Sequence, residues 1–271
     1  MQHVSLRGEQ VPAVGLGTWE LEGASCRQAV AEALDMGYRH IDTAQAYDNE
    51  GQIGEVLRTS AVDRGEIFLT TKVANRNHAP SDVHRSVGDS LRALGSDYVD
   101  LLLVHWPVEF DTIGQTLEAM LELHAEGKVR HIGVSNFSPT QFELAAEIAP
   151  VACNQVEYHP FLSQAAVLEM ARKHDAIVTA YSPLARGDVV SDGTITEIAE
   201  RHGKSPAQVA LRWLIEQDGV TAVPKASSRE HLAANLDLFD FALTDADRER
   251  IDGLSRGERI IDPPFGPDWD G

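Results

Sequence analysis

Short apolar runs and longer amphipathic segments alternate along the whole chain. The apolar runs carry few charged residues and are rich in valine, isoleucine and leucine. Such runs are typical of strands that are buried on both faces, as in parallel sheets. The pattern therefore predicts eight strands, at residues 13–18, 39–43, 66–73, 97–106, 129–136, 151–158, 176–182 and 219–225.

The segments between these runs carry apolar residues at helical spacing. Gly37 and Gly95 are expected to end the first two helices, because glycine readily takes the left-handed conformation found there. Ser81 and Asp82 are expected to cap the start of the second helix. The predicted helices cover residues 25–37, 81–95, 112–127, 164–175, 194–203 and 205–217.

Eight strands that alternate with helices in 271 residues predict an α/β fold of the (β/α)8 TIM-barrel type, with one domain spanning residues 1–271. The opening residues predict a β-hairpin around Arg7 and Gly8 that covers the lower mouth of the barrel. Two helices between the last two strands indicate that extra helices are present. The alternative is an open doubly wound sheet, but GLGTW at 15–19 does not match the G-x-G-x-x-G motif of its dinucleotide-binding form.

The chain has a formal net charge of -19. Nucleic-acid binding requires a basic face, so no nucleic-acid partner is expected. No apolar run approaches the roughly 18 residues of a membrane helix, and the first residues lack the pattern of a secretion signal, so we expect a cytoplasmic protein without a membrane partner. Cys26 and Cys153 are predicted to be free thiols. An acidic, lysine-poor surface suits a high-salt cytoplasm or an ordinary acidic protein, and both readings stay open.

Polar side chains recur at the carboxyl ends of the predicted strands, which is where barrel enzymes carry their chemistry. Packing alone does not explain so many polar groups, because each unpaired buried charge costs several kcal/mol. The residues concerned are Asp42, Lys72, His105, Ser135, Asn136, Asn154, Gln155, Tyr181, Ser182 and Lys225, with Tyr47 in the loop after the second strand. One mouth of the barrel is therefore the expected functional site.

Four of these residues, Asp42, Tyr47, Lys72 and His105, together suit acid–base chemistry on a carbonyl. Taken singly, each has a structural explanation: a helix cap, a rim aromatic, a lysine that reaches water, or a core histidine. Taken together, an ammonium beside a phenol lowers its pKa from about 10. The aspartate holds that ammonium, and the histidine orients a carbonyl oxygen. A hydride-donating cofactor is still required.

The motifs DTAQAYDNE (42–50), LLLVHWP (101–107), GVSNF (133–137), NQVEYHP (154–160), YSPLARG (181–187) and VPK (223–225) occur in this order. With them the chain resembles the aldo-keto reductase family over nearly its whole length, and prokaryotic diketogluconate and methylglyoxal reductases in particular. The resemblance implies reduction of small aldehydes and ketones with NADPH. It makes Tyr47 the general acid, tuned by Lys72 and Asp42, and lets His105 orient the carbonyl.

The same resemblance implies a set of cofactor-binding residues. Tyr181 would stack on the nicotinamide, Lys225 would meet the adenosine 2'-phosphate, and Asn235 would reach the adenine. Ser135, Asn136 and Gln155 would bind the carboxamide, and the loop at Ser182 and Leu184 would follow the pyrophosphate. The full set is Thr18, Ser135, Asn136, Gln155, Tyr181, Ser182, Leu184, Lys225, Ser227, His231 and Asn235.

The chain departs from the family pattern at two places. PKASSREHLAAN has Ala226 after the lysine and His231 where the family carries arginine. Binding of the 2'-phosphate is therefore expected to be weaker, which predicts a reduced preference for NADPH, with NADH usable as well. Ala74 stands where relatives often have tryptophan, which predicts a wider pocket. An apolar wall for the substrate is expected from Trp19, Trp106, Phe110 and Trp269, although barrel packing or a surface position would also explain them.

The sequence thus predicts an NAD(P)H-dependent carbonyl reductase, without a metal and monomeric. The alternative is a non-catalytic nucleotide-binding barrel that regulates a partner protein; the intact Asp42, Tyr47, Lys72 and His105 set argues against it. A metal-dependent hydrolase would need clustered ligands such as H-x-H on the first strand, where AVGLGT offers none. A glycosidase would need paired carboxylates at strand ends, where His105 and Tyr181 stand instead.

Overall fold

Eight parallel strands form the centre of the molecule in the computed structural model, which describes residues 2–269. Each strand falls within one of the eight predicted runs, so the strand prediction is confirmed. The strands are β3 (Leu16–Gly17), β4 (His40–Asp42), β5 (Phe68–Val73), β6 (Val99–Val104), β7 (Val129–Ser135), β8 (Val151–Glu157), β9 (Ile177–Tyr181) and β10 (Val220–Ala222).

The sheet closes on itself between its first and last strands. Strands β3 to β10 are hydrogen-bonded in sequence order, and parallel bridges join Val14 to Ala222 and Gly17 to Lys225. At this seam the Ala222 amide donates to the carbonyl of Ala13 over 2.8 Å. A Cβ on Gly17 would lie 2.4 Å from the Val223 carbonyl oxygen, so glycine is required there. The predicted (β/α)8 barrel is confirmed.

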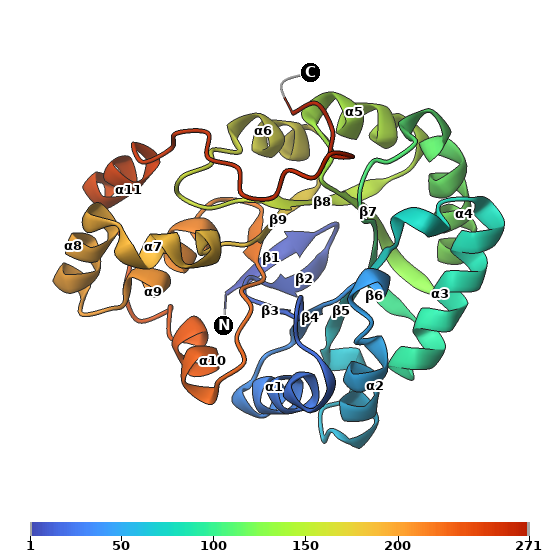
Figure 1. Cartoon of the computed structure of the whole chain (residues 1–271), viewed down its shortest axis with the longest axis horizontal. Helices are drawn as coiled ribbons and strands as arrows, with labels where there is room; N and C mark the ends of the chain where they lie inside the picture. The colour runs from blue at the N-terminus through green and yellow to red at the C-terminus, as the bar shows by residue number, and fades with distance from the viewer. Residues whose placement is uncertain (1, 270–271) are drawn as a thin grey trace.

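Helices surround the barrel on its outer side (Figure 1). They are α1 (Gly23–Met36), α2 (Glu50–Thr59), α3 (Pro80–Leu94), α4 (Ile113–Ala125), α5 (Pro139–Ile148), α6 (Ala165–Lys173), α7 (Asp188–Ser191), α8 (Gly193–His202), α9 (Pro206–Ile215), α10 (Arg229–Leu236) and α11 (Asp245–Asp252). Short 3-10 turns are η1 (Gln45–Tyr47), η2 (Arg64–Glu66), η3 (Asn75–Asn77), η4 (Phe110–Thr112) and η5 (Ala185–Gly187). The predicted extra helices are present, since α7 and α8 precede α9 between β9 and β10.

The helix ends test two of the sequence predictions. Gly37 and Gly95 follow α1 and α3 with φ of 100° and 63°, as expected for glycine at a helix end. The predicted cap by Ser81 and Asp82 is wrong. Helix α3 begins with Pro80 and has no side-chain cap, because a proline at the first position needs no partner for its nitrogen.

The predicted N-terminal hairpin is present as β1 (His3–Leu6) and β2 (Glu9–Pro12). Its turn residues Arg7 and Gly8 have φ of 49° and 92°, the left-handed conformations that a tight two-residue hairpin turn requires. The Arg7 guanidinium donates to the carbonyls of Pro150 and Val151 over 2.9 and 3.1 Å. Because Val151 begins β8, this contact places the hairpin at the amino-terminal mouth, away from the strand ends that carry the polar residues.

Two further observations concern the chain as a whole. Cys26 and Cys153 are buried free thiols, as predicted. Within residues 2–269, every helix is too short or too polar to cross a membrane.

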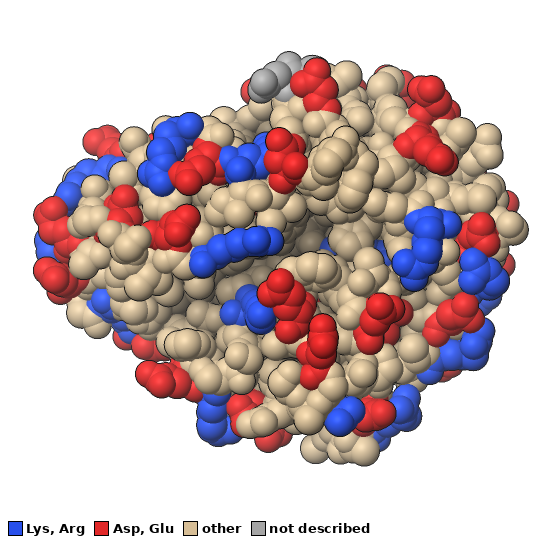
Figure 2. All heavy atoms as spheres, in the orientation of Figure 1, with Lys and Arg blue, Asp and Glu red and all other residues tan. Residues whose placement is uncertain are grey.

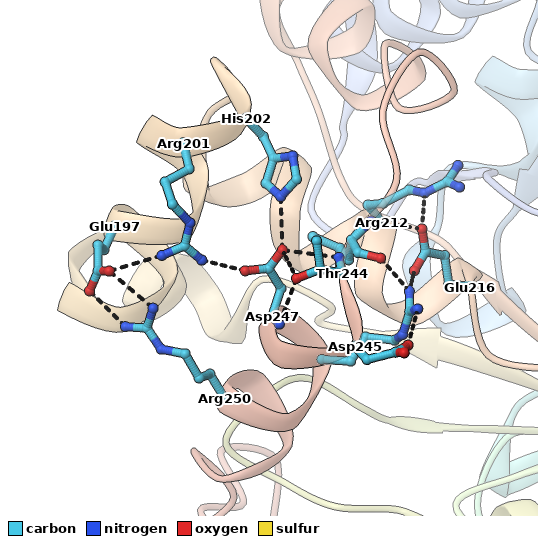
Figure 3. A network of polar contacts seen from close by, with 11 residues as sticks. Glu197, Arg201, His202, Arg212, Glu216, Thr244, Asp245, Asp247 and Arg250 are labelled. Atoms are coloured by element: carbon cyan, nitrogen blue, oxygen red, sulfur yellow. Dashed lines mark hydrogen bonds and ion pairs between the residues drawn. The ribbon is translucent and has the colours of Figure 1, made fainter.

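A buried carboxylate attaches the last helix to the barrel wall (Figure 3). Asp247 of α11 accepts hydrogen bonds from His202 over 2.9 Å and from the Thr244 hydroxyl over 2.7 Å, and it pairs with Arg201. The residue is 2% exposed. Burial raises the pKa of Asp247, but the hydrogen bonds outweigh it and hold the pKa below the usual 3.8. The ionised form therefore joins α8 and α11.

Replacing Asp247 by asparagine is expected to lower the free energy of unfolding by about 2–3 kcal/mol, because the Arg201 guanidinium loses its charged acceptor. The pKa of Asp247 is lower in the folded protein than in the unfolded chain, so ionisation of Asp247 stabilises the fold. This stabilisation is complete above pH 3.8 and is lost as pH falls through the folded-state pKa. Urea unfolding of the unaltered protein and of Asp247→Asn at pH 7 and pH 3 measures this effect. The difference in the free energy of unfolding between the two proteins should be smaller at pH 3. Asp245→Asn, an exposed neighbour on α11, serves as control with a change below about 0.5 kcal/mol.

Candidate functional site

Three charged or acidic side chains meet at the carboxyl end of the barrel. Lys72, the fifth residue of β5, is 1% exposed. Its ammonium donates to Asp42 over 2.6 Å, to the Thr43 carbonyl over 2.9 Å and to the Tyr47 hydroxyl over 3.4 Å. Asp42 ends β4, and the 3-10 turn η1 that follows brings Tyr47 back over the strand end. Asp42 and Tyr47, five residues apart, and Lys72 from the next strand form one hydrogen-bonded chain.

The second oxygen of Asp42 is also occupied. Gln155 of β8 donates to it over 2.6 Å from the opposite side of the barrel. The backbone carbonyl of Asp42 accepts from the Thr18 hydroxyl over 2.9 Å. Gln155, expected from the sequence among the carboxamide-binding residues, therefore directs its amide nitrogen at Asp42. Both Gln155 and Thr18 fix the position of the aspartate.

Burial and charge act in opposite directions on this chain. Burial lowers the pKa of Lys72, but the charges of Asp42 and Tyr47 outweigh it, so the pKa is raised and the ammonium persists. For Tyr47, burial raises the pKa and Lys72 lowers it, with a net rise above 10.0. From the sequence we considered only the Lys72 ammonium and expected the pKa of Tyr47 to be lowered. The direction of that prediction is wrong. Tyr47 carries its proton at neutral pH.

His105 lies on the other side of the phenol. The ring centroids of Tyr47 and His105 are 5.6 Å apart at 74°. Burial, with Lys72 and His78 nearby, lowers the pKa of His105 to about 3. The imidazole is therefore neutral at physiological pH and has one N–H to donate. Its backbone carbonyl accepts from the Asn136 amide over 3.0 Å, which ties the end of β6 to β7.

Two buried residues beside the site were missed by the sequence reasoning. Gln45, two residues before Tyr47, accepts from the Ala74 amide and from the Asn77 side chain, each over 2.9 Å. It thereby positions the loop after β5. His78 in this loop is 6% exposed, and burial lowers its pKa. Gln45 stands inside the motif DTAQAYDNE (42–50), so its place in the motif was the available signal, whereas nothing local marked His78.

A second polar group lies along the ends of β7, β8 and β9. The Ser135 hydroxyl donates to the Gln155 carbonyl over 2.8 Å. The Tyr181 hydroxyl donates to the Asn136 side chain over 2.7 Å. Asn154 is directed elsewhere, since its amide donates to the Phe137 carbonyl over 2.9 Å. Ser135, Asn136 and Tyr181 are thus brought together as the sequence expected.

The loop after β9 has unusual backbone geometry. Ser182, Ala185 and Arg186 have φ of 46°, 47° and 51°, which is costly for residues other than glycine. Leu184 lies within this stretch and packs partly buried against the core. Strained backbone conformations of this kind cluster at active sites and where a protein holds a ligand closely.

The remaining expected cofactor residues lie in the loop before α10 and within α10. Lys225, Ser227 and His231 are exposed, whereas Asn235 is buried. The Lys225 ammonium pairs with Glu20 over 3.2 Å at the seam where β10 meets β3. Hydroxyl and cationic groups at a helix start match the chemistry of a phosphate. These groups, the strained loop and the polar set around Tyr181 fit an extended nicotinamide dinucleotide.

The four expected wall residues make three separate aromatic contacts. Trp19, 48% exposed, meets the Tyr47 ring edge-on at 4.8 Å. Trp106 packs against Trp269 at 6.4 Å. Phe110 instead packs against Phe137 at 5.8 Å. Trp106 and Trp269 are thus in direct contact with each other, and Trp19 is in contact with Tyr47.

A cavity of about 490 Å³ lies beside Tyr47 and is lined by Trp19, Glu20, Glu22, Gly23, Ala46, Tyr47, Asp48 and Gln52. Figure 2 shows the surface hollowed near the middle of the barrel, with acidic and basic side chains around the hollow. The Tyr47 side of the site is thus open to a small molecule. Among residues 2–269, no group of three histidine, cysteine or acidic residues is placed to hold a metal ion.

Comparison with known proteins gives a consistent assignment. Residues 13–256 match the model of the Aldo/keto reductase family. An aldo-keto reductase of Mycolicibacterium smegmatis is 42% identical, over 96% of this chain and 94% of that protein. The methylglyoxal reductase DkgB of Escherichia coli O157:H7 is 37% identical, over 96% of this chain and 99% of that protein.

A solved structure agrees with the sequence relatives. The crystal structure provisionally described as a 2,5-diketo-D-gluconic acid reductase B superposes with a TM-score of 0.97 and is 44% identical, covering 100% of this chain and 98% of that one. The family resemblance predicted from six motifs is confirmed. The chain belongs to the aldo/keto reductase family and is an oxidoreductase.

Proposed function

We propose that the protein reduces small aldehydes and ketones to alcohols with NADPH, and with NADH as well, and that Tyr47 donates the proton. The observation that carries the proposal is the chain from Asp42 through Lys72 to the Tyr47 hydroxyl, with neutral His105 beside it. Methylglyoxal, 2,5-diketogluconate and simple aldehydes are the expected substrate types. The relatives support this range, since they include a methylglyoxal reductase and a solved structure provisionally described as a 2,5-diketo-D-gluconic acid reductase.

Each group of residues would have a separate role. Ser135, Asn136 and Tyr181 would hold the nicotinamide, and the start of α10 would hold the adenosine phosphate. A nicotinamide held there would supply the hydride that reduces the carbonyl carbon. His105 donates its N–H to the carbonyl oxygen and orients it, and Tyr47 transfers its hydroxyl proton to that oxygen. The Lys72 ammonium, 3.4 Å from the Tyr47 hydroxyl, stabilises the phenolate that remains.

The direct test follows absorbance at 340 nm with purified protein, methylglyoxal and NADPH or NADH in turn. Oxidation of either cofactor that depends on both protein and aldehyde supports the proposal. A protein that binds NADPH yet turns over no aldehyde across several substrates and salt concentrations contradicts it. That result would favour a non-catalytic nucleotide-binding barrel that regulates a partner protein.

The pH profile of reduction is expected to be flat between about pH 6 and 9 and to decline only above 10, where Tyr47 begins to lose its proton. His105, with a pKa of about 3, does not change its charge in this range. Steady-state kcat/KM measured across this range gives the profile. An inflection near 6.5, the ordinary value for histidine, would mean that a histidine of the site titrates during the reaction and would contradict this assignment.

Cofactor selectivity is expected to be modest. His231 is exposed on α10 at the position where the family pattern has arginine, and an imidazole cannot make the bidentate contact by which a guanidinium binds a 2'-phosphate. Lys225 also forms an ion pair with Glu20, which competes with a phosphate for the ammonium. The ratio of kcat/KM for NADPH and NADH should therefore stay below about a hundredfold, or 2.7 kcal/mol. His231→Arg is expected to raise that ratio, and an unchanged ratio would exclude this position as a determinant.

A further inference from the structure

The strand β8 ends in a carboxylate that the proposed mechanism does not use. Glu157 is fully buried, and so is its neighbour His159. The His159 ring nitrogen Nε2 lies 2.8 Å from the Glu157 oxygen Oε1. A buried carboxylate costs several kcal/mol unless its oxygens are hydrogen-bonded, so its partners indicate what it holds.

The other partners of Glu157 come from the C-terminal segment, about a hundred residues away. The backbone amide of Ile260 donates to Oε1 and that of Ile261 to Oε2, each over 2.8 Å. Burial raises the pKa of Glu157, but His159 and the two amides outweigh it and hold the pKa below its usual value. An ionised carboxylate therefore binds two successive peptide groups, which is a strong form of hydrogen bond.

The anchored segment leads directly to the aromatic wall. After Ile261 the chain turns at Pro263, whose carbonyl accepts from the Gly266 amide over 2.8 Å. Phe265 then meets the Trp106 ring at 5.5 Å, and Trp269 meets it at 6.4 Å. Figure 1 shows this segment, in red, running past the ends of the strands beside β8 and β9. Trp106 directly follows His105, so the wall adjoins the proposed carbonyl site.

We propose that Glu157 is a positioning residue: it holds segment 259–269 so that Phe265 and Trp269 complete, with Trp106, the wall that receives the apolar end of a carbonyl substrate. This inference rests on the proposed function. Phe265 is 51% exposed despite its contact with Trp106, so one side of the ring is available to a ligand. Among simple aldehydes, the wall is therefore expected to favour those with an aromatic or other bulky apolar group a few carbons from the carbonyl.

The kinetic test compares propanal with 3-phenylpropanal, which differ by one phenyl group. Glu157→Gln replaces one carboxylate oxygen by an NH2 group. This group cannot accept the hydrogen bond that the backbone amide of Ile260 or Ile261 donates. The variant is expected to raise KM for 3-phenylpropanal about tenfold while kcat for both aldehydes and the Kd for NADPH change less than about twofold. Loss of kcat with both substrates, or no change in KM, would overturn the inference. Glu147→Gln, an exposed carboxylate on α5, is the matched control.

A second measurement does not depend on catalysis. Trypsin cleaves after Arg259, and the peptide bond there contains the amide of Ile260 that Glu157 binds. Mass spectrometry should show loss of residues 260–271 faster from Glu157→Gln than from the unaltered protein and the Glu147→Gln control. Equal rates would overturn the anchoring role. If no aldehyde is turned over but cleavage accelerates, the proposed function fails while the anchor stands.

Phe265→Ala covers the case in which Glu157→Gln does not fold. The half-exposed ring can be removed without opening the barrel core. This variant should raise KM for 3-phenylpropanal by about tenfold and leave propanal unchanged within about twofold. An unchanged KM for the phenyl substrate would remove Phe265 from the wall and overturn the proposal.

Discussion

Replacing Tyr47 by phenylalanine is expected to lower kcat for aldehyde reduction by about a thousandfold, within the range measured for general acids. The change removes one hydroxyl and keeps the ring, which meets Trp19 at 4.8 Å and His105 at 5.6 Å. The proton has no other donor of similar placement, because His105 is neutral and its N–H serves to orient the oxygen. Stopped-flow and steady-state measurements at 340 nm, with a separate titration of NADPH, give the result.

The control for this variant is another buried tyrosine. The Tyr38 hydroxyl donates to the Leu232 carbonyl over 3.0 Å, far from the proposed chemistry. Tyr38→Phe should leave kcat unchanged and cost about 1 kcal/mol of stability. The Kd for NADPH should stay the same in both variants. A Tyr47→Phe protein that keeps more than a tenth of the rate would show that the proton comes from elsewhere.

Replacing Lys72 by methionine is expected to lower kcat by about a hundredfold or more and to reduce the free energy of unfolding by about 3–5 kcal/mol. The ammonium would be lost from its places 2.6 Å from Asp42 and 3.4 Å from the Tyr47 hydroxyl. Asp42 would then keep only the Gln155 amide for its buried charge. The phenolate formed by proton transfer would lose its nearest cation. Urea unfolding and turnover at 340 nm measure the two effects separately.

The double variant Lys72→Met with Asp42→Asn separates structure from chemistry. Neutralising Asp42 removes the uncompensated charge, so much of the lost stability should return. The rate should stay low, because no cation lies beside Tyr47. If the double variant regains the rate as well, Lys72 acts only by supporting the fold. If neither variant loses stability, the buried pair contributes nothing measurable.

The barrel could be predicted from the sequence because its strands are buried on both faces. That burial leaves continuous apolar runs, as at 66–73 and 129–136, which differ plainly from the amphipathic helices around them. The polar residues that end these strands converge because parallel strands end at one side. Asp42, Lys72 and Tyr47 could therefore be placed together before any distance was known.

Other features depended on tertiary structure that no local pattern contains. The sign of the pKa change of Tyr47 needed the degree of burial as well as the nearby ammonium. Gln155 turned toward Asp42 because the two strand ends face each other across the barrel. The binding of Ile260 and Ile261 by Glu157 joins segments about a hundred residues apart. In the sequence, Glu157 was one letter of a family motif, and its partners are backbone amides that carry no sequence signal.

The seam of the barrel has a consequence for how the chain folds. Residues 13–17 pair with residues 222–225, so the first strand finds one of its two neighbours only after nearly all of the chain has been made. Until then β3 presents unpaired backbone groups along one edge, the kind of edge on which partly folded chains aggregate. The contact also closes a loop of most of the chain length, which makes it a late event. Closure at Gly17 is therefore expected to complete folding, and a side chain there would hinder the last step most.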